Sequence, residues 1–165
     1  MKVSGINFES IVDGYGVRVV IYLSGCLHNC KGCHNPETHS FSYGEDFGEE
    51  YQQNIIDYIN KTPFVKGITF SGGDPMYSAK ELLVFLKKIK KQEKNINVWI
   101  YSGFTYEKIL KNSSMKALLR YADVLVDGRF ELELKNLTLK FKGSENQRTI
   151  NLLETRKNNC LTLLE

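Results

Sequence analysis

Short apolar runs alternate with amphipathic stretches along this chain, and this alternation restricts its fold more than any other feature of the sequence. The apolar runs are rich in β-branched and aromatic residues, as is typical of buried strands. The stretches between them place apolar residues at helical spacing. Strands that alternate with helices form parallel βαβ units, so the sequence predicts an α/β fold built on a parallel sheet.

The predicted elements have defined positions. Strands are expected at 17–23, 67–71, 97–101 and 122–127, with weaker strand-like pieces at 137–141 and 148–153. Helices are expected at 49–60, from residue 78 onward, and at 105–120 as one broken helix or two short ones. Ser78 to Glu81 has the pattern of a capping box, with Tyr77 placed to pack on Leu82.

Length and charge limit the classes of protein to which this chain can belong. Residues 1–165 are predicted to form a single domain, which is shorter than the roughly 250 residues of a full eight-stranded barrel. The net charge of +3 comes from scattered lysines rather than a nucleic-acid footprint. No apolar run approaches the roughly 18 residues of a membrane helix. The start of the chain resembles no targeting signal, so we expect a reducing, cytoplasmic setting without membrane or direct nucleic-acid contacts.

Polar or glycine-rich loops follow each of the predicted strands. In parallel sheets the chemistry lies at the carboxyl ends of the strands, which share one edge of the sheet. The sequence therefore predicts a site where four loops meet: residues 24–34, 71–75, 102–104 and 127–129.

The first of these loops contains three of the four cysteines of the chain, in the spacing Cys26-x₃-Cys30-x₂-Cys33. Cysteine thiolates hold iron–sulfur clusters, and a four-iron cluster normally has four protein ligands. Three ligands leave one iron open, and an open iron can bind a substrate. The spacing therefore predicts Cys26, Cys30 and Cys33 as ligands of a [4Fe-4S] cluster.

Other interpretations of the cysteines exist. Four cysteines, three of them in one loop, are too few and too clustered for the disulfide framework of a secreted protein. Zinc is a rival, because His28 or His34 could complete a Cys₃His site, although structural zinc normally uses two separated ligand pairs. A zinc-binding adaptor without catalytic activity is therefore an alternative function. Cys160 could in principle be a fourth ligand, but the pattern around it favours a small buried apolar residue.

Two motifs together point to a known family. Cys26-x₃-Cys30-x₂-Cys33 after one strand, followed by Gly72-Gly73-Asp74-Pro75 after the next, resembles the radical S-adenosylmethionine enzymes. More narrowly, the chain is similar to the activating proteins of anaerobic ribonucleotide reductases. The narrower similarity lies in four segments and extends from about residue 5 to 151: 13–18, 33–38, 126–130 and 141–148.

The resemblance implies a truncated, partial barrel of parallel strands that binds S-adenosylmethionine at the open iron. One-electron cleavage of this cofactor would give a 5′-deoxyadenosyl radical. That radical would take a hydrogen atom from a glycine of the large anaerobic ribonucleoside-triphosphate reductase subunit. An external, flavodoxin-like one-electron donor is also implied. A radical S-adenosylmethionine enzyme acting on a small molecule is the alternative, although a short open barrel suits a bulky partner better.

The resemblance also implies roles for individual residues, none of which is a catalytic side chain, because the bound cofactor carries the chemistry. Gly72 and Gly73 would admit the cofactor's methionine end close to the backbone, and Asp74 would bind its ammonium group. Arg129 would pair with a substrate carboxylate or form a surface salt bridge. The remaining cofactor contacts would come from the flanks of the third cysteine and from two strand ends: Gly32, Cys33, His34, Ser102 and Asp127.

Further residues receive broader expectations. Many members of the wider family carry an aromatic residue where Gly32 stands, and His34 could supply a ring instead. His28 and His39 are expected to make solvent or loop contacts rather than to bind a metal. Tyr15, Tyr43 and Phe104 could line the mouth of the site. The last group is expected either to shape a docking face or to tie the ends of the chain together: Asp13, Arg18, Asn146 and Arg148.

Overall fold

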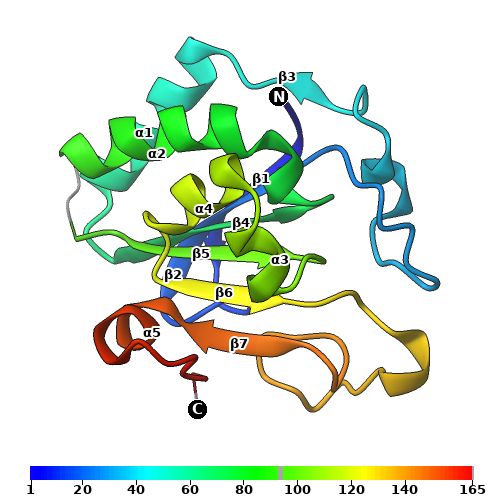
Figure 1. Cartoon of the computed structure of the whole chain (residues 1–165). Helices are drawn as coiled ribbons and strands as arrows, with labels where there is room; N and C mark the ends of the chain where they lie inside the picture. Colours follow the sequence, from blue (N-terminus) through cyan, green and yellow to red (C-terminus); the bar gives the residue numbers. More distant parts are fainter. Residues whose placement is uncertain (93–94, 165) are drawn as a thin grey trace.

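The computed structural model describes residues 1–92 and 95–164, and within them the strands form one seven-stranded sheet (Figure 1). Its spatial order is β3-β1-β2-β4-β5-β6-β7. The central strands β2, β4, β5 and β6 are parallel, whereas β1, β3 and β7 run antiparallel to their neighbours. The bounds are β1 Lys2–Ser10, β2 Val17–Leu23, β3 Glu45–Asp46, β4 Val65–Gly72, β5 Asn97–Ser102, β6 Val124–Asp127 and β7 Arg148–Asn151.

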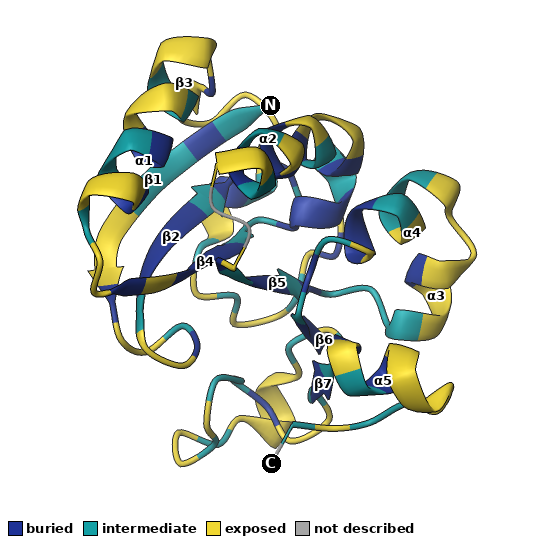
Figure 2. Ribbon diagram, turned by 90° about the vertical axis from the view of Figure 1, so that its left-hand side faces the viewer, coloured by how far each residue is buried: buried dark blue, intermediate teal, exposed yellow. Residues whose placement is uncertain are grey.

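Helices cover one face of this sheet (Figure 2). The α-helices are α1 Glu49–Lys61, α2 Ala79–Gln92, α3 Tyr106–Leu110, α4 Ser113–Leu119 and α5 Leu152–Asn158. Short 3₁₀ helices are η1 Pro36–His39, η2 Pro75–Ser78 and η3 Leu132–Leu134. Apolar residues at helical spacing, such as Ile55 and Ile59 of α1 or Leu82 and Leu86 of α2, pack into the core beneath the helices. None of the helices in the described ranges has the length and apolar character needed to cross a bilayer.

The predicted parallel centre is confirmed, and the predicted barrel is not. All four expected strands are present and pair in parallel, and 105–120 forms the two short helices α3 and α4. The edges differ, because β1 and β7 are antiparallel and, among the described residues, β3 and β7 end the sheet without pairing with each other. We did not predict β1, whose sequence Lys2–Ser10 mixes polar and apolar residues and is held by its pairing with β2.

Three local predictions are corrected by the structure. Residues 137–141 form turns and bends instead of a strand, and Phe141 has a positive φ of 62°. Residues 148–153 are a strand only as far as Asn151, whose side chain accepts a hydrogen bond from the Glu154 amide and begins α5. The helix predicted from residue 78 is present as α2, which begins at Ala79, but Ser78 does not cap it because it is the last residue of η2, which runs directly into α2. The cap of η2 is Asp74, which accepts a hydrogen bond from the Met76 amide.

The face of the sheet opposite the helices contains a buried arginine. The Arg18 guanidinium donates hydrogen bonds to Thr69 Oγ1 at 2.8 Å and to the Tyr15 carbonyl at 2.7 Å, and it lies 5.2 Å from the centre of the Trp99 ring. Burial lowers the pKa of Arg18 to about 10. Arg18 is fully buried, so of the two roles expected for it the geometry supports the structural one.

Gly67 makes room for this guanidinium. A Cβ at Gly67 would lie 2.5 Å from the Arg18 guanidinium, which its hydrogen bonds hold in place. We expect Gly67→Ala to lower the free energy of unfolding by about 1–3 kcal/mol through overpacking. Gly5→Ala is the matched control in another strand, because a Cβ there meets only the Tyr22 ring at 3.9 Å. Urea denaturation of both variants checks this, and equal midpoints would mean that Arg18 moves freely.

Candidate cofactor site at the carboxyl ends of the strands

The four predicted loops meet at the carboxyl ends of β2, β4, β5 and β6, where they line a cleft of about 730 Å³. The expected residues that line this cleft are Cys26, Cys30, Cys33, His34, Tyr43, Gly72, Gly73 and Ser102, whereas Tyr15 and Phe104 are not among its lining residues. Gly32, Asp74, Asp127 and Arg129 lie outside that lining set. The cleft also extends across the face of the sheet opposite the helices. There it reaches residues of the β1–β2 turn and of the 128–147 segment.

The cysteine loop begins directly after β2 and is tied to the neighbouring loops by backbone hydrogen bonds. The Gly25 amide donates to the Thr38 carbonyl at 2.8 Å, and the Asp74 amide donates to the Gly25 carbonyl at 3.0 Å. The Cys33 amide donates to the Cys30 carbonyl at 3.1 Å, which turns the chain between these two cysteines. The three thiols are therefore presented from one short, anchored loop at the edge of the cleft.

The three cysteines carry free, half-buried thiols. Burial raises the pKa of Cys26, and the nearby Asp74, Cys30 and Cys33 raise it further. Burial is also the main cause that raises the pKa of Cys30. Because thiolates rather than thiols bind metals, these cysteines must release protons when they bind iron.

This donor set fits a cubane cluster. In the part of the chain that the structure describes, no group of three His, Cys, Asp or Glu side chains surrounds a single point as one bound metal ion requires. In a cubane, each iron takes its own thiolate, so the donors stand around the cluster. Three free cysteines in one loop that line the same cleft match that arrangement.

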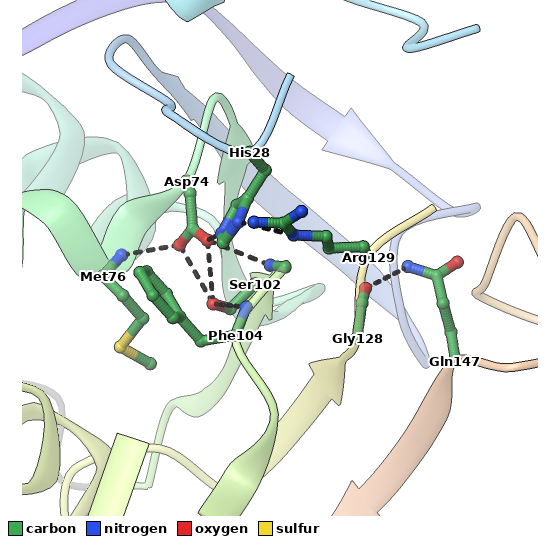
Figure 3. Close-up of polar contacts among 9 residues, drawn as sticks. His28, Asp74, Met76, Ser102, Phe104, Gly128, Arg129 and Gln147 are labelled. Atoms are coloured by element: carbon green, nitrogen blue, oxygen red, sulfur yellow. Dashed lines mark hydrogen bonds and ion pairs between the residues drawn. The ribbon is translucent and has the colours of Figure 1, made fainter. Parts of the chain in front are cut away.

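Asp74 is the centre of a buried polar network behind the cleft (Figure 3). Its carboxylate is 2% exposed and accepts hydrogen bonds from the Met76 and Gly103 amides, both at 2.9 Å. The Ser102 hydroxyl lies 3.0 Å from each carboxylate oxygen, and His28 Nε2 lies 2.6 Å from Oδ2. The Asp74 carboxylate thus joins the loops after β2, β4 and β5, while its proposed contact with an ammonium group stays a prediction.

His28 connects this network to Arg129. Arg129 Nε donates a hydrogen bond to His28 Nδ1 at 3.2 Å, so we assign the ring proton to Nε2, which donates to Asp74. The His28 ring is 8% exposed and packs edge-on against Phe104 at 4.6 Å. The hydrogen bond to His28 holds the exposed Arg129 beside the cysteine loop. His28 was expected to make solvent or loop contacts rather than to bind a metal, and it contacts two of the neighbouring loops while being buried from solvent.

Asp127 lies at the end of β6 but turns away from the cleft. Its carboxylate accepts hydrogen bonds from the Tyr106 amide at 2.6 Å and from Arg148 Nε at 2.9 Å. Arg148 also pairs with Glu107 at 3.0 Å, and that hydrogen bond lowers the pKa of Glu107 to about 2. These contacts join the start of α3 to β7, so the structural alternative for Arg148 is the one the geometry supports.

Of the two residues beside the third cysteine, Gly32 has no side chain and His34 supplies a ring. Gly32 has a φ of 74°, a conformation that favours glycine, and a Cβ there would lie 2.9 Å from Leu132. His34 lines the cleft together with Phe130, and their ring centres are 5.6 Å apart. We did not single out Phe130 as a site residue, although it follows Arg129 directly in one of the family-like segments.

Gln147 received no role from the sequence, and Cys160 differs from expectation. Gln147 holds the 128–147 segment closed, since its amide group donates to the Gly128 carbonyl at 3.0 Å and accepts from the Gly143 amide at 2.9 Å (Figure 3). Cys160 is exposed, so its prediction as a buried apolar residue is wrong. It follows Asn159, which ends α5 in a left-handed conformation, and the residues after it return along the edge strand β7.

Comparison with known proteins agrees with the donor set. Residues 12–150 match the family model described as a 4Fe-4S single cluster domain. Anaerobic ribonucleoside-triphosphate reductase-activating protein from Haemophilus influenzae is 36% identical over 140 residues, covering 83% of this chain and 89% of that protein. The chain belongs to this family. The Vibrio cholerae member is 37% identical over the same shares, and the phage T4 member is 33% identical over 87% of this chain and 92% of its own length.

The region that matches the family model covers nearly the whole site. The matched residues 12–150 include the cysteine loop, the Gly-Gly-Asp-Pro loop and the 128–147 segment. The described cleft is therefore part of the region that this chain shares with its relatives, whereas Cys160 lies beyond the family model.

Proposed function

We propose that this protein activates an anaerobic ribonucleoside-triphosphate reductase by reductive cleavage of S-adenosylmethionine at a [4Fe-4S] cluster. The supporting observation is that three free thiols and the Gly-Gly-Asp-Pro loop, which belong to different strands, line or border one cleft. When bound, the cluster and S-adenosylmethionine supply a 5′-deoxyadenosyl radical that takes a hydrogen atom from a glycine of the reductase.

The residues of the chain have separate tasks in this proposal. Cys26, Cys30 and Cys33 would hold the cluster through three thiolates, one fewer than usual, and the cofactor would complete its ligation. Gly72 and Gly73 line the cleft without side chains, which lets the cofactor approach the backbone. The cleft would hold the cofactor beside the cluster. Such positioning can lower the activation barrier of a reaction by about 7–11 kcal/mol.

Arg129 and Asp74 act at the methionine end of the cofactor. His28 holds Arg129 Nε, which leaves the terminal nitrogens of the guanidinium available to a carboxylate. Asp74 fixes the positions of the loops through its buried hydrogen bonds. An external one-electron donor of the flavodoxin type reduces the cluster, and the thiol-based site suits the reducing cytoplasm.

Isotope transfer tests the proposed function. The reductase is prepared with deuterium on the α-carbon of the target glycine and incubated anaerobically with this protein, dithionite and S-adenosylmethionine. We expect deuterium in 5′-deoxyadenosine, and an organic radical whose hydrogen splitting is visible by electron paramagnetic resonance. Unlabelled deoxyadenosine without an organic radical would show that the reductase is not the substrate.

A further inference from the structure

Two side chains of opposite charge act on the cysteine loop from neighbouring loops. Asp74 is 2% exposed and carries its carboxylate behind the cleft. Burial is the main cause that raises the pKa of Cys30, and the negative charge of Asp74 adds to it. The positive charge of Arg129 opposes this shift and favours the Cys30 thiolate. Arg129 therefore places a positive charge where the thiolates of the loop would hold a cluster.

The position of the Arg129 guanidinium is fixed by the cysteine loop itself (Figure 3). Its Nε donates a hydrogen bond at 3.2 Å to Nδ1 of His28, which lies within that loop. The His28 ring is 8% exposed, packs against Phe104 and binds Asp74 through Nε2 at 2.6 Å. Gly103 leaves room for the ring, because a Cβ there would lie 2.5 Å from His28 Cδ2. The ring cannot turn freely, so it holds the guanidinium in place.

The side chain of Arg129 is not what holds its own segment to the fold. The Arg129 carbonyl accepts a hydrogen bond from Asn146 Nδ2 at 2.8 Å, and the Gly128 carbonyl accepts one from Gln147 at 3.0 Å. These backbone contacts fix the start of the 128–147 segment without the guanidinium. The hydrogen bond to His28 thus has a different consequence, which is to keep a positive charge beside the cysteine loop.

This charge matters for electron uptake by a cluster. The cluster accepts one electron from the donor, and no bond forms or breaks in that step. The electron adds a negative charge to a site that already contains three thiolates and lies near the Asp74 carboxylate, so these groups oppose its uptake. Local charge is one of the factors that set the reduction potential of an iron–sulfur cluster. Arg129 is exposed, and solvent weakens its field, so its charge acts on the cluster only if it is held close.

We propose that Arg129, held by His28, makes the cluster easier to reduce by keeping a positive charge beside the cysteine loop. This inference rests on the iron–sulfur cluster of the proposed function. It gives Arg129 a task before any S-adenosylmethionine binds, in addition to its contact with the cofactor's carboxylate. His28 is a positioning residue in this scheme, since it acts only through Arg129.

Three variants separate the charge of Arg129 from its other properties. Arg129→Gln removes the charge, and Arg129→Lys keeps it without the planar guanidinium. Lys31→Gln is the matched control, because it removes a positive charge from the cysteine loop itself. The Lys31 side chain is 80% exposed and pairs with Glu133 at 3.8 Å, so its charge is largely screened. Each protein is reconstituted anaerobically, and its iron and sulfide are counted. The reduced cluster is then measured by paramagnetic resonance during a potentiometric titration, without S-adenosylmethionine or the reductase.

We expect the ratio of reduced to oxidised cluster at a fixed potential to fall about 3- to 10-fold in Arg129→Gln. For a one-electron couple this corresponds to a potential lower by about 30–60 mV. Arg129→Lys and Lys31→Gln should stay within about twofold of the native protein. Arg129→Met, a second uncharged variant, should behave like Arg129→Gln and decides the matter if glutamine lowers the iron content.

An unchanged potential in the uncharged variants would overturn the proposal. An equal fall in Arg129→Lys would overturn it as well, because the guanidinium's shape and not its charge would then matter. The same holds for an equal fall in Lys31→Gln, which would mean that any positive charge on the loop is sufficient. If the native protein held no reducible cluster at all, the proposed function itself would fail.

Discussion

Replacing Cys26, Cys30 or Cys33 by alanine is expected to abolish the iron–sulfur cluster, whereas Cys160→Ala keeps it. The first three cysteines line the cleft from one loop, and Cys160 is exposed beyond α5. Iron and sulfide are counted after anaerobic reconstitution. Each single variant of the loop should fall from about four irons per chain to a small fraction of that, because a cubane with two thiolates lacks the anchoring that the loop provides.

Cys160→Ala is the matched control for these variants. It also removes one thiol, but this thiol lies beyond α5, next to the outermost strand β7. Full iron content in Cys30→Ala would show that two cysteines are enough. Loss of iron in Cys160→Ala would show that the C-terminal residues reach the cluster. Either result would overturn the ligand assignment, and a colourless protein that retains one zinc ion would support the adaptor function instead.

Asp74→Ala is expected to have the second largest effect, on stability as well as on cofactor binding. The change leaves the Met76 and Gly103 amides and His28 Nε2 without their acceptor inside the protein. Leaving a buried donor without its acceptor costs about 1–3 kcal/mol for each group. The loops after β2, β4 and β5 then lose their common anchor, so we also expect S-adenosylmethionine to bind at least about 10-fold more weakly.

Asp46→Ala is the control, because Asp46 is exposed and pairs with Lys2 at 3.1 Å. An exposed pair contributes about 1 kcal/mol or less. Urea denaturation of the unloaded protein measures stability, and the change in the cluster's paramagnetic spectrum with added cofactor measures affinity. If Asp74→Ala unfolds at the same urea concentration as Asp46→Ala yet binds the cofactor weakly, Asp74 contacts the ammonium group directly instead of anchoring the loops.

Much of the central fold was predictable because its signals are local. β2, β4, β5 and β6 are apolar runs buried on both faces, and such runs identify themselves without their neighbours. β1 has a half-exposed, mixed sequence, and only its pairing with β2 makes it a strand. For residues 137–141 the sequence predicted a strand that does not form. Phe141 packs on Trp99 there, without strand pairing.

The sequence by itself determined which three thiols lie together and at which edge of the sheet the cleft lies. Three cysteines within one loop are close in space whatever the rest of the chain does, and the carboxyl ends of parallel strands always meet at one edge. Only the tertiary structure decided how the polar residues divide their tasks. His28 contacts Asp74, which is 46 residues away in the sequence, and Arg129, which is 101 residues away. Asp127 pairs with Arg148 instead of facing the cleft. Such contacts depend on strand register and on the side toward which each side chain points, and these are set by the packing of the whole sheet.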